Sequence, residues 1–128
     1  MSTIKQDIME YLSNEGLRPQ EEDFGIYFKY QLLSFFIHWD EEDASFLSII
    51  LPDIFSTDEN NRTDALEAIN QINENHKVVK CFLCDDRVWI SAEQLLDSSP
   101  SYEDIIPRTL TMLATARDLF YEYLRNGS

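Results

Sequence analysis

Glycine is scarce in this chain of 128 residues, which has it only at positions 16, 25 and 127. A phosphate-cradling loop needs several closely spaced glycines, so the sequence argues against a nucleotide cofactor. A zinc site needs four ligands, and beside Cys81 and Cys84 the usual ligand types occur only at His38 and His76. We expect neither a cofactor nor a metal.

Basic residues are also few: ten Lys and Arg stand against 24 Asp and Glu, for a formal charge of −14. Binding to nucleic acid or to an anionic membrane surface depends on clustered Lys and Arg, so both partners are excluded. The acids cluster at Glu21–Asp23, Asp40–Asp43 and Asp58–Glu59, between apolar runs. We expect solvated loops there, the alternative being an acidic patch for a basic partner.

Long hydrophobic runs are absent. The most apolar stretch, Phe46–Phe55, contains a serine, a proline and an aspartate, and the first ten residues are too charged for a signal peptide. We therefore expect a cytoplasmic protein with reduced thiols.

The apolar content is that of a folded domain, with 44% hydrophobic and 12% aromatic residues, and the length fits one domain over residues 1–128. Helical spacing of apolar residues predicts a helix over about 3–15, stopped by Gly16, and another over about 62–75. A third, heavily buried helix begins between residues 101 and 105 and runs to about 124, starting late or bending because of Pro107.

Alternating apolar residues predict strands over 24–30, 32–39, 46–51, 78–84 and 87–92. Pro52 ends the third strand or gives it an edge position, and Asp85-Asp86 forms a tight turn between the last two strands. The order α-β-β-β-α-β-β-α indicates an α+β fold, with a five-stranded antiparallel sheet and helices mainly on one face.

The two faces of this sheet differ in their expected cover. The first and last helices can cover the face lined by Ile26, Phe28, Phe35, Ile37, Ile49, Val79 and Leu83. The opposite face is too apolar for an ordinary solvated surface, so it must be covered by the middle helix, a second copy or a partner. It holds Tyr27, Phe36, His38, Phe46, Ile50, Phe82 and Trp89.

Catalytic chemistry finds little support. Cys81 and Cys84 have redox spacing, but three residues apart on a strand they point to opposite faces, so we expect one or two buried thiols and no redox pair. His38 and His76 lack a visible catalytic partner. His76 comes where a helix is expected to end, and its interaction with the helix dipole is sufficient reason for a histidine there. Asn70 and Asn73 share a helical face; we expect their amides to bind the turn before residue 78, the alternative being a recognition role.

Several segments resemble the bacterial YbjN-type domain, labelled a "putative sensory transduction regulator". They are Ala68-Ile-Asn-Gln-Ile-Asn73, the hairpin Lys80-Cys-Phe-Leu-Cys-Asp-Asp-Arg-Val-Trp-Ile90, the long terminal helix, and Pro52 after the third strand. The chain departs from the family in lacking a glycine in its Asp-Asp turn. The resemblance implies a fold like that of type III secretion chaperones, no catalytic residues, and a small module that binds proteins.

We therefore expect a non-enzymatic, chaperone-like or regulatory protein-binding module. The alternative is a small-molecule sensor with its ligand between the middle helix and the sheet. The partner is an unidentified protein or a second copy of the chain. The binding residues predicted from the sequence are Tyr27, Phe36, His38, Phe46, Phe82 and Trp89.

Overall fold

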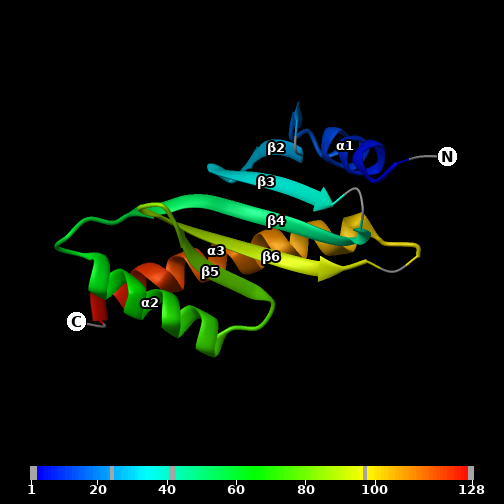
Figure 1. The fold of residues 1–128 in the computed structure, drawn as a ribbon. Helices are drawn as coiled ribbons and strands as arrows, with labels where there is room; N and C mark the ends of the chain where they lie inside the picture. The colour runs from blue at the N-terminus through cyan, green and yellow to red at the C-terminus, as the bar shows by residue number, and fades with distance from the viewer. Residues whose placement is uncertain (1–2, 24, 41–42, 97, 127–128) are drawn as a thin grey trace.

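The fold is known from a computed structural model that describes residues 3–23, 25–40, 43–96 and 98–126. Three helices flank one antiparallel sheet (Figure 1). In chain order the elements are α1 (Ile4–Asn14), β1 (Gln20–Glu22), β2 (Gly25–Tyr30), β3 (Leu33–Asp40), β4 (Asp43–Ser56), α2 (Arg62–Asn75), β5 (Val79–Cys84), β6 (Arg87–Leu95) and α3 (Tyr102–Asn126).

The α+β class is confirmed, but the number of strands is wrong: the sheet has six, in the order β1-β2-β3-β4-β6-β5. The extra strand is β1, which lies in the acidic cluster that we expected to be a loop. Its three residues pair with Gly25–Tyr27 and are all exposed. A three-residue polar strand has no apolar alternation, so its pairing depends on the neighbouring strand β2 rather than on its own pattern.

The helix starts follow local chemistry. Thr3 and Gln6 form a capping box at the start of α1, each side chain binding the other residue's backbone N–H. α3 begins at Tyr102, the Ser101 carbonyl accepts from the amides of Asp104 and Ile105, and Pro107 lies inside the helix. A proline so near the start removes only one internal hydrogen bond, which the buried apolar face of α3 can outweigh.

β4 continues past Pro52, so this proline does not end the strand; it lies where β4 no longer pairs with β3, which agrees with the alternative of an edge position. Between the pairs Leu51–Ile90 and Phe55–Val88, three residues of β4 lie opposite one residue of β6. This bulge places Pro52 where no ladder hydrogen bond is required of it, and Asp53 takes φ of 54°. β4 thereby reaches Ser56, five residues beyond its predicted end.

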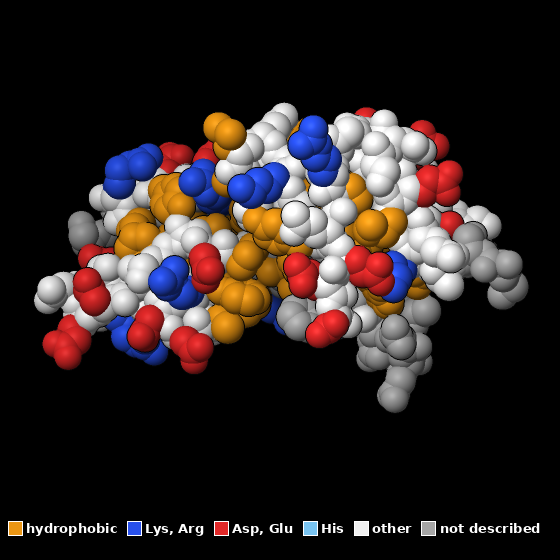
Figure 2. Space-filling view, turned by 90° about the horizontal axis from the view of Figure 1, so that it is seen from above, with side chains coloured by type: hydrophobic (Ala, Val, Ile, Leu, Met, Phe, Trp, Pro, Cys, Tyr) orange, Lys and Arg blue, Asp and Glu red, His pale blue; other side chains and the backbone are white. Residues whose placement is uncertain are grey.

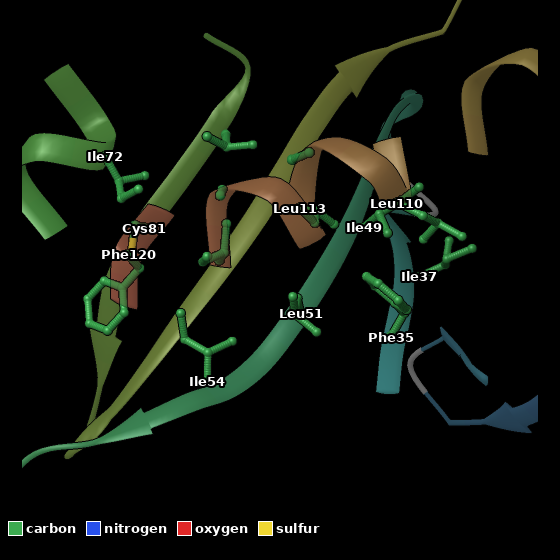
Figure 3. Packing of buried hydrophobic residues seen from close by; sticks show 14 of the residues in the cluster. Phe35, Ile37, Ile49, Leu51, Ile54, Ile72, Cys81, Leu110, Leu113 and Phe120 are labelled. Atoms are coloured by element: carbon green, nitrogen blue, oxygen red, sulfur yellow. The ribbon is translucent and has the colours of Figure 1, made fainter. Parts of the chain in front are cut away.

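All three helices pack on one face of the sheet. α3 lies behind β4 and β6, and α1 lies beside β2. α2 lies near β5, beside the C-terminal part of α3 (Figure 1). Side chains from β3, β4 and β5 meet those of α2 and α3 in one buried cluster (Figure 3). Six of the seven residues predicted for this face are buried, and Leu83 packs at its border.

One of our alternatives was that the middle helix covers the opposite face of the sheet. The structure shows that it does not. The buried side of α2 consists of Ala65, Ala68, Ile69 and Ile72, and it joins the same core as α3. This arrangement follows from β5 being an edge strand: α2 lies beside it and contacts both β5 and α3. The sheet therefore has one face without a helix among the described residues.

Candidate functional site

The candidate site is this uncovered surface, here called the open face. It carries all six residues predicted to bind a partner, because each has the strand phase opposite to the core. None of the six is fully buried: His38 and Phe46 are exposed and the other four are half-buried. The open face consists of Tyr27, Phe36, His38, Phe46, Ile50, Phe82, Trp89 and Leu95.

Two pairs of aromatic side chains face each other across neighbouring strands. Tyr27 of β2 is the register partner of Phe36 of β3. Phe82 of β5 is the register partner of Trp89 of β6, with ring centroids 6.3 Å apart and planes inclined at 48°. Cross-strand aromatic pairs stabilise a sheet, and on a surface they also offer a large contact area at small entropic cost.

Phe36 occupies its place because β2 has a glycine beside it. A Cβ atom at Gly25 would lie 2.2 Å from the Ile37 carbonyl oxygen and 2.9 Å from two carbons of the Phe36 ring. Only a residue without a side chain fits there, so the ring lies over the backbone of β2. The aromatic surface therefore depends on Gly25, which pattern analysis counted only as part of a strand.

The bulge of β4 orients the second aromatic pair. Asp53, at the centre of the bulge, accepts a hydrogen bond of 3.0 Å from the indole Nε1–H of Trp89 through its Oδ1 atom. Aspartate tolerates the left-handed backbone better than most residues, which explains its presence at this φ. The bulge thus fixes an indole ring on the open face.

Leu95 is a member of the open face that sequence reasoning missed. It is 71% exposed and pairs in register with Phe46, which is 46% exposed. The strand alternation through Trp89 and Ser91 would have placed Leu95 on this face, but we ended the predicted strand at residue 92. Together, Phe46 and Leu95 are an exposed apolar pair at one end of the open face.

Charged groups interrupt the apolar residues of the open face without dominating them. Lys80 and Glu93 form a 3.1 Å ion pair in which both side chains are more than half exposed. Solvent screens such a pair, so it adds little to stability and leaves both groups able to meet a partner. His38 lies between Phe36 and the acidic segment that begins at Asp40.

Apolar groups reach the surface of the molecule together rather than singly. In a view from above, turned by 90° from that of Figure 1, hydrophobic side chains reach the surface in several neighbouring patches, with many acidic side chains below them (Figure 2). Contiguous apolar surface with a polar rim is typical of sites that contact other molecules.

The groups considered for chemistry have structural surroundings. Cys81 is buried and Cys84 is partly exposed; both are free thiols, and burial raises the pKa of Cys81 to about 12. His76 caps the C-terminus of α2, and its Nε2 shares a 3.2 Å hydrogen bond with the Tyr123 hydroxyl. Within the described ranges, no three or more Cys, His, Asp and Glu are grouped as metal ligands.

The two asparagines do different things. We predicted that Asn73 binds the turn before strand β5. It instead binds the backbone of β5 itself at Cys81, so the predicted hydrogen-bond partner is wrong. Asn70 is exposed and lines an open groove of about 510 Å³ along the outer side of α2. The strand is the nearer backbone because α2 lies beside the edge of the sheet.

The predicted ligand position between the middle helix and the sheet is filled by protein. Ala68 and Ile72 of α2 and Cys81 of β5 are all buried there in the core.

In the part of the chain that the structure describes, no helix is both long and apolar enough to cross a membrane.

Two crystal structures are similar at low sequence identity, which shows the fold alone. An uncharacterised protein from Methanothermobacter thermautotrophicus has a TM-score of 0.67 and 12% identity, over 95% of this chain and 96% of that one. YbjN from E. coli, titled "a putative transcription regulator", has a TM-score of 0.63 and 10% identity, over 93% and 87%.

No curated protein matches the chain significantly. Residues 5–125 match the family YbjN, described as "Putative bacterial sensory transduction regulator". The resemblance noted in the helix-hairpin-helix half of the sequence is therefore confirmed, while its further likeness to secretion chaperones stays a prediction. The chain belongs to the YbjN family.

Proposed function

We propose that this protein is a non-enzymatic regulatory module that binds a protein partner on the open face of its sheet. The observation that carries the proposal is the absence of any described helix from a face with two aromatic pairs and an exposed Phe46–Leu95 pair. The regulator label of the family supports the same class of function.

The partner that fits best is a segment with an apolar side and neutral or basic flanks. Partly exposed aromatic rings supply most of the binding energy in such interfaces. The net charge of −14 slows the approach of acidic partners and speeds that of basic ones. Side chains of the partner would meet Phe46 and Leu95 first, because these are the most exposed apolar residues of the open face.

The proposal is tested by comparing Leu95→Asp with the matched control Leu66→Asp. Both leucines are exposed, at 71% and 44%, and both changes add one negative charge, but Leu66 lies on the outer side of α2. Proteins captured from a lysate of the source organism by the wild type and the control, but lost with Leu95→Asp, are candidate partners.

Each candidate is then purified and titrated by calorimetry against the wild type, Leu95→Asp, Phe46→Asp and the control Leu66→Asp. We expect Leu95→Asp and Phe46→Asp to weaken binding at least about tenfold, which corresponds to a loss of about 1.4 kcal/mol or more for an anchor residue of the interface. Equal binding by all variants, with unchanged circular dichroism, would remove the open face as the binding site.

A further inference from the structure

A hollow lies at the tip of the β2–β3 hairpin, next to the open face but distinct from it. The register of β3 with β4 ends at the pair Phe36–Ile50, whereas β4 continues to Ser56. The bulge of β4, the hairpin tip and α3 therefore border a half-open hollow of about 440 Å³, here called the hairpin slot. Its volume is within the range of small-molecule sites.

One wall of the hairpin slot is apolar and strained. The turn between β2 and β3 has Gln31 at φ 50° and Leu32 at φ 69°, the geometry of a type I′ turn that normally holds Asn and Gly. Leu32 is also fully exposed, at 101%. A leucine that is both strained and exposed costs stability, and such costs concentrate at functional positions.

The part of α3 that lines the slot carries a cation stacked on an aromatic ring. The guanidinium of Arg117 lies 4.8 Å from the centre of the Tyr121 ring, and the Tyr121 hydroxyl donates to the Ile54 carbonyl oxygen. Stacking holds the guanidinium in one plane and leaves its donors at the edge. Its bond to Asp118 is long, at 3.4 Å, and that carboxylate is 76% exposed.

The remaining polar groups of the slot are partly engaged with the protein. Asp53 binds the Trp89 indole, and the hydroxyl groups of Tyr27 and Ser34 bind each other at 2.8 Å. A guanidinium has five N–H donors, and the planar fork that they form matches a carboxylate. Arg117 is thus the group in the slot with most hydrogen-bonding capacity to offer a ligand, and its local positive charge opposes the net charge of −14 that otherwise disfavours an anion.

We infer that the hairpin slot binds a small molecule with a carboxylate and an apolar body about as large as one aromatic ring. The carboxylate pairs with Arg117, and the apolar body lies against Leu32 and Pro52. This is a site for a free ligand, separate from the protein partner of the open face. Tyr27 lines both surfaces, so a bound ligand would lie beside the partner.

The experiment is an NMR titration of the labelled full chain with phenylacetate, and with its neutral isostere phenylacetamide. We expect phenylacetate to shift the amides of Gln31, Leu32 and Asp53 and the Arg117 side-chain signal saturably, with millimolar affinity. Phenylacetamide should bind at least about tenfold more weakly, because it cannot form the charge-assisted pair. Equal binding of the two probes, or no saturable shift, would overturn the inference.

Variants separate the slot from a general effect of charge. Arg117→Gln should abolish measurable phenylacetate binding, whereas Arg108→Gln, an exposed arginine on the same helix, should leave it unchanged. Arg117→Lys keeps the charge but loses the planar fork, so binding should weaken severalfold while the fold is preserved. Loss of binding with Arg108→Gln as well would contradict the site. Leu95→Asp, which tests the open face, should not affect phenylacetate.

Discussion

The side-chain amide of Asn73 binds the backbone of Cys81 twice. Asn73 Nδ2 donates to the Cys81 carbonyl oxygen at 2.9 Å, and the Cys81 N–H donates to Asn73 Oδ1 at 2.8 Å. Strand β5 is an edge strand, so these are the backbone groups that another strand would otherwise pair with. The amide occupies them and joins α2 to the sheet.

We predict that Asn73→Ala destabilises the protein by about 1–3 kcal/mol, because it leaves both backbone groups without their partner. It should also increase self-association at high concentration, since the edge of β5 becomes available. Urea unfolding measures the first effect and light scattering the second. Asn70→Ala is the matched control, three residues away and exposed, and should change stability by less than about 0.5 kcal/mol.

Gly25→Ala should destabilise the protein by about 2 kcal/mol or more. The new Cβ would meet the Ile37 carbonyl oxygen and the Phe36 ring, so β2 or the aromatic side chain must move. Gly16→Ala is the control: Gly16 has φ of 76° but no atom within 4 Å, so only the cost of a left-handed alanine applies, about 1–2 kcal/mol. A larger loss at Gly16 than at Gly25 in thermal unfolding would contradict this prediction.

Asp53 is expected to stabilise the open face through both its backbone and its carboxylate. Asp53→Asn keeps an acceptor for Trp89 and a tolerance for positive φ, so its effect should be the smallest. Asp53→Gly loses the acceptor but fits the backbone, and Asp53→Ala loses both advantages. We predict that stability falls in the order Asn, Gly, Ala, with about 1–3 kcal/mol lost for Ala.

Trp89 fluorescence, measured in a Trp39→Phe background, reports the same bond. It should shift to longer wavelength in Asp53→Ala, because the indole becomes more mobile and more hydrated. An unchanged spectrum with an unchanged unfolding midpoint would show that the Asp53–Trp89 bond does not hold the ring.

The buried thiol of Cys81 makes stability depend on alkaline pH. Burial raises its pKa from 9.0 to about 12, so between these values the unfolded chain loses this proton while the folded protein keeps it. Stability is therefore constant below pH 9 with respect to this group. It should fall by up to about 1.4 kcal/mol per pH unit between pH 9 and pH 12.

Cys81→Ala isolates that contribution, because the tyrosines that titrate in the same range remain in both proteins. Burial also raises the pKa of Tyr11 and Tyr102, so only the difference in slope between variant and wild type is assigned to Cys81. In the native state Cys84 should react with iodoacetamide and Cys81 should not. Parallel pH curves for the two proteins would contradict the prediction.

The sequence was sufficient for features that depend on local pattern. Ile8 and Leu12 are buried on one side of α1, and the alternation of β2 and β3 divides Ile26 and Ile37 from Tyr27 and Phe36 as predicted. The turn at Asp85-Asp86 also joins the last two strands as expected. These features follow from residues close together in the chain, where spacing is directly visible.

Features that depend on distant partners were missed. β1 exists because β2 offers it an edge, and β4 passes Pro52 because β6 accommodates the bulge. The position of α2 depends on the bonds from Asn73 to a strand that comes later in the chain. Leu95 was missed from the open face because the polar residues Glu93 and Gln94 interrupt the apolar alternation, so the predicted strand ended before them.

The two edges of the sheet limit how this protein can assemble with itself. β1 is only three residues long and acidic, and Asn73 binds the backbone of β5 at Cys81, which hinders the addition of another strand at each end of the sheet. Copies that met through their open faces would stack sheet on sheet, and that contact is used up once two copies have joined. Association of two copies through their open faces would therefore give a closed two-fold pair and not a growing filament.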